Sequence, residues 1–140
     1  EIQKFPITPY LEQICDTPVL VIDGAHNRNA AKQLREEALR RWNAGGIVEI
    51  VGVLADKDFT EVGRLLAPLA KKIFTVTPNN PRALSAQDLA QCFRQFCDDV
   101  TPADSPAQAW QRAKQEQLPV LAFGSLSWLR ELRDAVEEQT

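Results

Sequence analysis

The stretch VLVIDGAHNRNAA, residues 19–31, begins as an apolar run, passes through a polar turn and ends in a helix-forming segment. Val19–Ile22 predicts a buried strand, and the segment Asn29–Trp42 predicts a helix because its apolar residues recur at helical spacing. Between the two lie Asp23 and His26, the single histidine of the chain. A turn that only joined a strand to a helix would need neither residue, so this turn is a candidate functional segment.

The rest of the chain repeats this order of apolar strand, polar turn and amphipathic helix. Ile47–Leu54, Lys72–Thr77 and Pro119–Phe123 are apolar runs of strand length, separated by segments with helical spacing. Apolar strands that alternate with amphipathic helices predict a parallel sheet covered on both faces. The predicted fold class is therefore α/β, with a three-layer α/β/α, Rossmann-like and mostly parallel sheet.

Polar residues and one proline mark the ends of the predicted helices. Asp58, followed three residues later by Glu61, predicts a helix start that resembles a capping box. Ser85 and Ser105 stand where N-cap residues are expected. Pro68 lies near the end of the second helix and predicts that this helix is shortened or kinked.

Composition limits the classes of partner. The 140 residues suffice for one domain with a real core, and the net charge of −3 gives no basic footprint for nucleic acid or an anionic membrane. No apolar run approaches the ~20 residues that span a bilayer, and the first residues do not resemble a signal peptide. We therefore expect neither a nucleic-acid nor a membrane partner.

The cysteines indicate a reducing compartment. Cys15, Cys92 and Cys97 form no C-x-x-C pair, which argues against a disulfide framework or a zinc site and favours a cytoplasmic protein with reduced thiols. The chain starts at Glu1 and contains no methionine, so we expect it to be a piece of a longer protein.

Unusual polar residues follow each of the four predicted strands. They lie in segments 23–27, 55–58, 77–82 and 124–127. The carboxyl ends of parallel strands meet at one edge of the sheet, where open α/β proteins bind ligands. Helix N-termini point at the same edge and favour phosphate or carboxylate groups. The sequence therefore predicts a ligand site at this edge.

Each of these residues also has a purely structural interpretation. Asp23 and Asn27 can cap the following helix, and Ser125 can cap the last one. His26 lacks a second ligand for a metal, and Asn80 is a common turn residue. Taken one at a time, most positions favour the structural interpretation; their convergence on one edge favours a site.

Several kinds of chemistry lack their sequence signatures. No G-x-G-x-x-G follows a strand, which argues against a nicotinamide or flavin dinucleotide site. No G-x-x-x-x-G-K-[ST] is present to hold the β- and γ-phosphates of ATP, and no G-x-S-x-G accompanies the single histidine. The predicted edge can bind ligands, but it lacks an evident apparatus for making or breaking bonds alone.

Four motifs in order make the chain resemble a known family. They are D-G-A-H-N at 23–27, L-A-D-K-D at 54–58, T-P-N-N-P-R-A at 77–83 and G-S-L at 124–126. Together they resemble the C-terminal domain of the folylpolyglutamate synthases, including the bifunctional dihydrofolate synthases, within the Mur ligase superfamily. The resemblance covers the chain from about Val19 to its end, and D-G-A-H-N is its specific part.

The resemblance implies an ATP-dependent amide ligase. Such enzymes use ATP to convert a carboxyl group of dihydropteroate or a folate into an acyl phosphate, which the amino group of L-glutamate attacks with release of phosphate. A P-loop on a separate N-terminal ATPase domain, with Mg²⁺, holds the transferred phosphates. The C-terminal domain closes over that site, so this chain is expected to be inactive alone.

The resemblance also assigns nucleotide-binding residues. Asp23 would accept hydrogen bonds from the ribose of ATP, His26 would lie near the phosphates, and Asn27 would help to hold the turn. In this chain Arg28 stands where the family commonly has proline. An upstream arginine that helps to bind the nucleotide in the family has no equivalent in residues 1–18.

The remaining assignments concern the amino acid that is added. Lys57 would meet the glutamate substrate through its charge and Ser125 through its hydroxyl group. Asn80 and Arg82 match a motif that contacts the added amino acid in related Mur ligases, and Arg82 can clamp a carboxylate. After G-S-L the family often has tyrosine, whereas this chain continues with Ser127 and Trp128.

These assignments give a domain division and leave alternatives open. We expect residues 1–18 to be a lead-in or linker segment that can carry a variable strand, and residues 19–140 to form the Mur ligase-type C-terminal domain. One alternative is a freestanding nucleotide- or amino-acid-binding regulatory module. Another is the corresponding domain of a sister ligase that adds a different amino acid.

Overall fold

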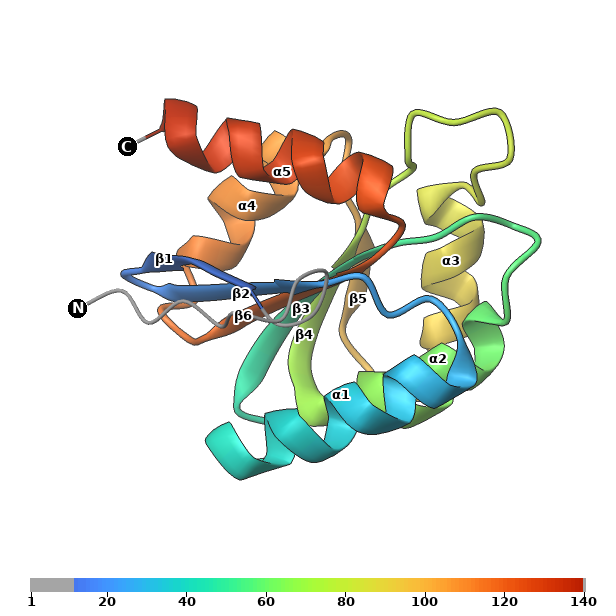
Figure 1. The fold of residues 1–140 in the computed structure, drawn as a ribbon, viewed down its shortest axis with the longest axis horizontal. Coiled ribbons are helices and arrows are strands. Elements are labelled where there is room, and N and C mark those ends of the chain that lie inside the picture. Colours follow the sequence, from blue (N-terminus) through green and yellow to red (C-terminus); the bar gives the residue numbers. More distant parts are fainter. Residues whose placement is uncertain (1–11, 140) are drawn as a thin grey trace.

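A six-stranded sheet forms the centre of the computed structural model, which describes residues 12–139 (Figure 1). The strands are β1 (Glu12–Asp16), β2 (Val19–Asp23), β3 (Ile47–Gly52), β4 (Ala70–Thr75), β5 (Val100–Pro102) and β6 (Val120–Gly124). Their order across the sheet is β1-β2-β6-β3-β4-β5, and each neighbouring pair is parallel except β1 with β2. The predicted α/β class with a mostly parallel sheet is confirmed.

Helices cover both faces of this sheet. They are α1 (Arg28–Arg41), α2 (Phe59–Leu66), α3 (Ala86–Phe93), α4 (Pro106–Lys114) and α5 (Leu126–Glu138). Figure 1 shows α1 and α2 on one side of the sheet and α4 and α5 on the other. Helix α3 packs into the same apolar cluster as α1 and α2. Two buried apolar clusters result, one that includes Leu66 and Phe93 beneath the sheet and one that includes Phe74 and Trp128 above it.

The strands differ from the prediction at their ends and in number. Strand β1 lies in the expected lead-in segment, of which residues 1–11 are outside the described residues. The short edge strand β5 was not foreseen. The predicted strands Ile47–Leu54 and Lys72–Thr77 end two residues too late, because the chain leaves the sheet after Gly52 and after Thr75 to form loops.

Two of the three predicted caps are confirmed. The hydroxyl groups of Ser85 and Ser105 accept hydrogen bonds from backbone N–H groups of their helices. The predicted helix start at Asp58 is confirmed, because Asp58 is the N-cap residue of α2, but the capping-box interaction is wrong, since the Asp58 side chain makes no cap hydrogen bond. Glu61 instead accepts two hydrogen bonds of 2.9 Å from the guanidinium of Arg64, a charge-assisted bidentate pair.

The end of the second helix follows the prediction from Pro68. Helix α2 stops at Leu66, and the 3₁₀ turn Ala67–Leu69 carries the chain into β4. Proline cannot donate the backbone hydrogen bond that would continue an α-helix. Among residues 12–139, no helix combines the length and apolar character needed to cross a membrane.

Candidate functional site

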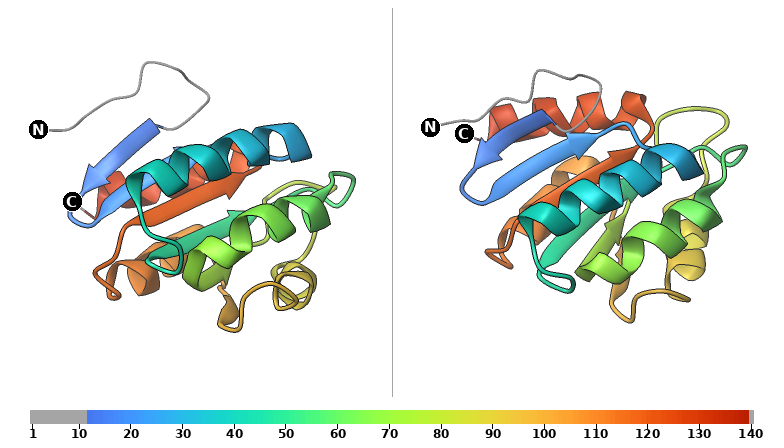
Figure 2. Two further views of the ribbon diagram at one scale, coloured as in Figure 1. Left: turned by 90° about the horizontal axis from the view of Figure 1, so that it is seen from below. Right: turned by 60° about the horizontal axis from the view of Figure 1, so that its bottom comes forward.

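The four polar segments predicted from the sequence meet at one edge of the sheet. Strands β2, β3, β4 and β6 all run toward this edge, and α1, α2, α3 and α5 begin there. Both views in Figure 2 show the loops that leave these strands gathered at the same end of the molecule. We call this end the carboxyl edge, formed by segments 23–27, 53–58, 76–85 and 124–127.

The first segment is a tight turn built from its own side chains. Asp23 is 3% exposed, and its Oδ1 accepts the backbone N–H of Ala25 at 2.8 Å. The Nδ1 of His26 lies 2.8 Å from the carbonyl oxygen of Gly24. A carbonyl oxygen only accepts, so Nδ1 carries the proton in this contact. In the neutral ring, Nε2 is consequently the acceptor.

Asn27 caps helix α1. Its Oδ1 accepts the backbone N–H of Ala30 at 2.9 Å, and its backbone is extended, as is usual for an N-cap residue. Asn27 therefore has the structural role of an N-cap residue, as the sequence allowed. Helix α1 begins directly after this residue, so its N-terminus lies at the carboxyl edge.

A pocket of about 200 Å³ brings together residues from all four segments. Its lining residues are His26, Leu54, Lys57, Asn80, Ser125, Leu126 and Ser127. We call it the Lys57 pocket. Four of the seven predicted site residues meet here although they lie up to about a hundred positions apart in the chain. Convergent polar groups on a partly apolar wall are typical of small-molecule sites.

Lys57 gives this pocket its charge. The side chain is half-buried, and no salt bridge joins it to a carboxylate of the described residues. An ammonium group without a counter-ion in a partly enclosed site attracts an anionic ligand group more strongly than one in open water.

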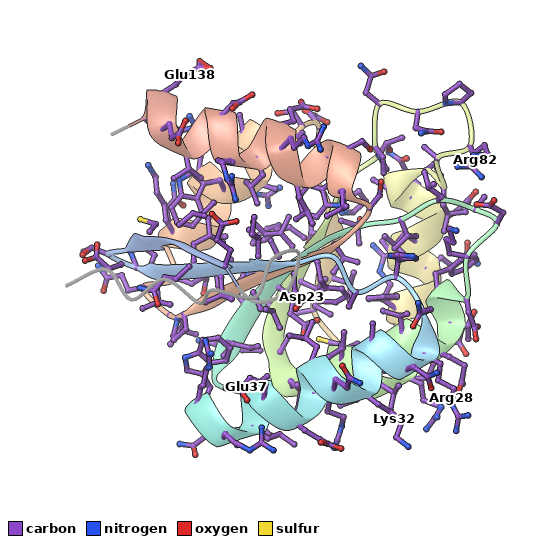
Figure 3. All side chains as sticks on the ribbon, viewed as in Figure 1. Asp23, Arg28, Lys32, Glu37, Arg82 and Glu138 are labelled. Atoms are coloured by element: carbon purple, nitrogen blue, oxygen red, sulfur yellow. The ribbon has the colours of Figure 1, made fainter. Side chains whose placement is uncertain are left out.

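Arg82 does not line the Lys57 pocket. Its guanidinium forms a salt bridge of 2.7 Å with Asp56, and its backbone N–H donates to Oδ1 of Asn80 at 2.8 Å. The carbonyl oxygen of Arg82 also accepts the backbone N–H of Ala55. These contacts tie segment 76–85 to segment 53–58. Figure 3 shows Arg82 at the outer margin of the carboxyl edge.

Asp23 lies in a second, adjoining pocket of about 180 Å³. This pocket, the Asp23 pocket, is lined by Glu12, Ile22, Asp23, Gly24, Leu126, Leu129, Arg130 and Arg133. Leu126 belongs to both pockets, and its side chain is 47% exposed. The turn at 23–27 thus has Asp23 in one pocket and His26 in the other.

The sequence interpretation missed the part of the site that helix α5 contributes. Leu126, Leu129, Arg130 and Arg133 recur at spacings of three, one and three residues, which is one stripe of a helix. The signal was present, because this stripe begins inside the G-S-L motif. It could not be assigned to a site without knowing that β2, and with it Asp23, lies next to β6 in the sheet.

Metal ligation is not supported on the described part of the chain. Residues 12–139 contain no group of three or more histidine, cysteine, aspartate or glutamate side chains placed to hold a metal ion.

Comparison with known proteins gives a consistent result. The family model for the Mur ligase, glutamate ligase domain matches residues 11–126. Folylpolyglutamate synthase of Lacticaseibacillus casei is 43% identical over 75 residues, which are 53% of this chain and 17% of that protein. Dihydrofolate synthase/folylpolyglutamate synthase of Haemophilus influenzae is 30% identical over 128 residues, 86% of this chain and 29% of that protein.

Solved structures share the fold. Escherichia coli FolC in complex with ADP superposes with a TM-score of 0.82 at 23% identity, covering 92% of this chain and 31% of that one. A bifunctional folylpolyglutamate synthase/dihydrofolate synthase with Mn, AMPPNP and L-glutamate bound gives 0.79 at 24% identity, covering 94% and 32%. The chain thus spans less than a third of the length of these relatives.

Proposed function

The chain belongs to the Mur ligase glutamate ligase domain family, and on this premise we propose that it is the C-terminal domain of an ATP-dependent folylpolyglutamate synthase/dihydrofolate synthase. The matched relatives carry these names. The proposed whole enzyme adds L-glutamate to a folate or to dihydropteroate.

The Lys57 pocket is the observation that carries this proposal. It offers the ammonium group of Lys57, which forms no salt bridge within residues 12–139, with the hydroxyl group of Ser125 and the amide group of Asn80 on one partly apolar wall. A small dicarboxylic amino acid has two anionic groups and one amine, which match a cation and neutral hydrogen-bonding groups. We assign glutamate to this pocket, with Lys57 on a carboxylate and Ser125 and Asn80 as hydrogen-bonding partners.

Arg82 is assigned to the same substrate from the outer margin. Its guanidinium holds Asp56 in the structure. Both side chains of this salt bridge are largely exposed, so the salt bridge contributes little free energy and can be exchanged. In the proposed enzyme, Arg82 exchanges Asp56 for a carboxylate of the incoming amino acid.

The nucleotide is assigned to the turn at 23–27. Asp23 accepts ribose hydroxyl groups, which is compatible with its bond to Ala25 because a carboxylate has about four lone-pair sites. His26 lies toward the phosphates, and Asn27 holds the turn by capping α1. The N-terminus of α1 adds a partial positive charge near the phosphates.

The proposed reaction has two steps. A carboxylate oxygen of the pteroate or folate substrate attacks the γ-phosphorus of ATP, which gives an acyl phosphate and ADP. The glutamate amine then attacks the acyl carbon, the carbon–oxygen bond to phosphate breaks, and the amine loses a proton. This chain contributes by holding the amine near the acyl phosphate, which is catalysis by positioning.

The proposed enzyme needs a second domain. This chain contains no P-loop, so its partner is an N-terminal ATPase domain of the same protein that binds the phosphates together with Mg²⁺. We place the domain boundary near residue 18, with residues 1–18 as the lead-in, whose strand β1 pairs with β2 at the edge of the sheet, and residues 19–140 as the domain. The carboxyl edge faces the ATPase domain when the enzyme closes.

Ligation by the full-length protein tests this function. Purified protein is incubated with ATP and labelled L-glutamate, and with dihydropteroate in one series and a reduced folate in another. We expect ATP-dependent transfer of label to at least one acceptor, and none when ATP is omitted. Transfer of another amino acid in preference to glutamate would indicate a sister ligase, and no transfer at all would refute the proposal.

A further inference from the structure

Besides Asp23, the Asp23 pocket contains three charged side chains that the assignments above leave unused. It holds the carboxylates of Asp23 and Glu12 and the guanidinium groups of Arg130 and Arg133. Arg133 forms a salt bridge with Glu12, so these two charges balance. No salt bridge joins Arg130 to a carboxylate in residues 12–139. Arg130 is therefore the cation of this pocket that is available to a ligand.

The position of Arg130 along α5 decides which part of a ligand it can meet. Leu126 stands between the two pockets, and Arg130 lies about one helical turn farther from the carboxyl edge. If the ribose is at Asp23 and the phosphates lie toward His26, then the base lies on the opposite side of the ribose. Leu129 and Arg130 line the Asp23 pocket beyond Leu126, away from His26, and we assign this wall to the base.

The chemistry of this wall suits a flat aromatic ring. Ile22, Leu126 and Leu129 give it apolar surface, and a guanidinium group is planar and stacks on aromatic faces. The volume of about 180 Å³ is below the roughly 300–1,000 Å³ of pockets that enclose drug-sized ligands. The pocket therefore fits one portion of a nucleotide and not the whole molecule.

We propose that Arg130 is a nucleotide-binding residue that stacks on the purine base of ATP in the Asp23 pocket. The inference rests on the proposed function, and it adds a residue outside the four motifs that carried the family resemblance. Helix α5 then contributes to both ligands, with Ser125 at its N-terminus on the amino acid and Arg130 one turn later on the nucleotide.

Kinetics and binding on the full-length enzyme test the proposal. Arg130→Ala should raise the KM for ATP and the Kd for ADP about fivefold, the scale of a partly exposed cation–π contact. The KM for glutamate and the affinity for inorganic pyrophosphate should not change, because pyrophosphate has no base. Arg130→Lys should restore the affinity at most in part, since an ammonium group can contact an aromatic face but cannot stack on it as a planar ion.

The matched control is Arg40→Ala, which removes an exposed arginine from the last turn of α1. It should leave all four constants unchanged. Equal weakening of ADP and pyrophosphate binding, or full rescue by Arg130→Lys, would show a simple charge effect and overturn the stacking role. If Arg130→Ala changed only the KM for glutamate, the pocket would bind the amino acid, and this result would also overturn the stacking role.

Failure of the proposed function is distinguishable from failure of this inference. If the wild-type enzyme ligates glutamate and Arg130→Ala leaves ADP affinity unchanged, then only the inference is refuted. If the wild-type enzyme shows no ligation and no ADP binding, the proposed function falls and the inference falls with it.

Discussion

The indole N–H of Trp128 donates a hydrogen bond of 2.8 Å to the carbonyl oxygen of Gly52. The same oxygen accepts the backbone N–H of Ser125 at 2.9 Å. Trp128 is 1% exposed, so it fastens the first turn of α5 to the end of β3 from within the core. The carboxyl edge thereby receives Ser125 and Leu126 in a defined position.

Replacing Trp128 with phenylalanine tests the contribution of the hydrogen bond between Trp128 and Gly52. The change removes the indole donor and part of the buried ring, and the Gly52 carbonyl keeps its bond from Ser125. We expect a loss of at least about 1 kcal/mol in the free energy of unfolding, measured by urea denaturation. Trp42→Phe is the control, because Trp42 is only partly buried. Equal losses in the two variants would contradict a specific role for the Trp128 bond.

Trp128 also shows what the sequence could predict at this position. The departure from the usual tyrosine after G-S-L was visible, and it left the local aromatic contact unspecified. The contact could not be derived because it joins residues 76 positions apart, and their proximity depends on β6 lying beside β3. The positions of the motifs along the chain could be predicted from the sequence. The contact partner of each side chain could not, because it depends on the order of the strands in the sheet.

The same distinction applies to the whole site. Periodicity predicted β2, β3, β4 and β6, and the rule for parallel sheets predicted that their carboxyl ends share one edge. Which residues share a pocket depended on side-chain packing: Lys57 and Ser125 meet, whereas Arg82 is held away by Asp56. The capping box at Asp58 failed for a related reason, since Glu61 has a better partner in Arg64.

Glu49 is the one charged residue of the otherwise apolar strand β3, and the sequence pattern did not mark it. Its burial predicts a free energy of unfolding that depends on pH. Glu49 lies in β3 between Ile73 of β4 and Leu121 of β6 and is fully buried. Neither carboxyl oxygen has a hydrogen-bond partner in the part of the chain that the structure describes. Burial raises the pKa of Glu49 well above its usual 4.5. The folded protein therefore keeps this proton over a pH range in which the unfolded chain has lost it.

The sign of the effect follows from proton binding. Between the two pKa values the folded state binds more protons than the unfolded state, so the free energy of unfolding decreases as pH rises above 4.5 and levels off beyond the raised pKa. Glu49→Gln removes this dependence. We expect Glu49→Gln to match wild type near pH 4 and to be more stable at pH 8.

Urea denaturation from pH 4 to pH 8 measures this difference. Glu36→Gln is the control, because Glu36 is exposed on α1 and its replacement leaves the buried carboxyl group of Glu49 in place. Subtracting each variant from wild type cancels the opposite contribution of Glu37, whose pKa is lowered by its hydrogen bond from Arg41. A wild-type protein that gains stability over Glu49→Gln with rising pH would show that Glu49 has a partner in solution.

Lys57→Ala in the full-length enzyme should raise the KM for glutamate by about tenfold to a hundredfold, the scale of a charge-assisted contact. The KM for ATP should change little, because Lys57 and Asp23 lie in different pockets. Ser125→Ala should act in the same direction with a smaller effect. The control is Lys71→Ala, an exposed lysine in β4. An unchanged KM for glutamate in Lys57→Ala would show that glutamate does not bind in this pocket.

Asp23→Asn should weaken ATP binding by about tenfold while leaving the fold intact. The asparagine oxygen can still accept the N–H of Ala25, so the turn is preserved, but the negative charge and acceptor capacity for ribose hydroxyl groups are reduced. The KM for ATP reports the effect, and thermal unfolding of the variant checks the turn. An unaltered KM for ATP with full activity would place the ribose elsewhere.

The 140-residue chain alone should catalyse no ATP-dependent ligation of glutamate. Its carboxyl edge offers binding groups, but the sequence has no P-loop to hold the transferred phosphates, and positioning alone cannot supply the phosphorylated carboxyl group. Labelled glutamate, ATP and each acceptor are therefore incubated with the chain and, in parallel, with the full-length enzyme at equal concentration. Supplying a chemically prepared acyl phosphate sharpens the test, because it bypasses the missing step. If the chain positions glutamate, amide formation from the acyl phosphate should be faster with wild type than with Lys57→Ala, whereas equal rates would mean that the pocket binds glutamate only in the closed enzyme.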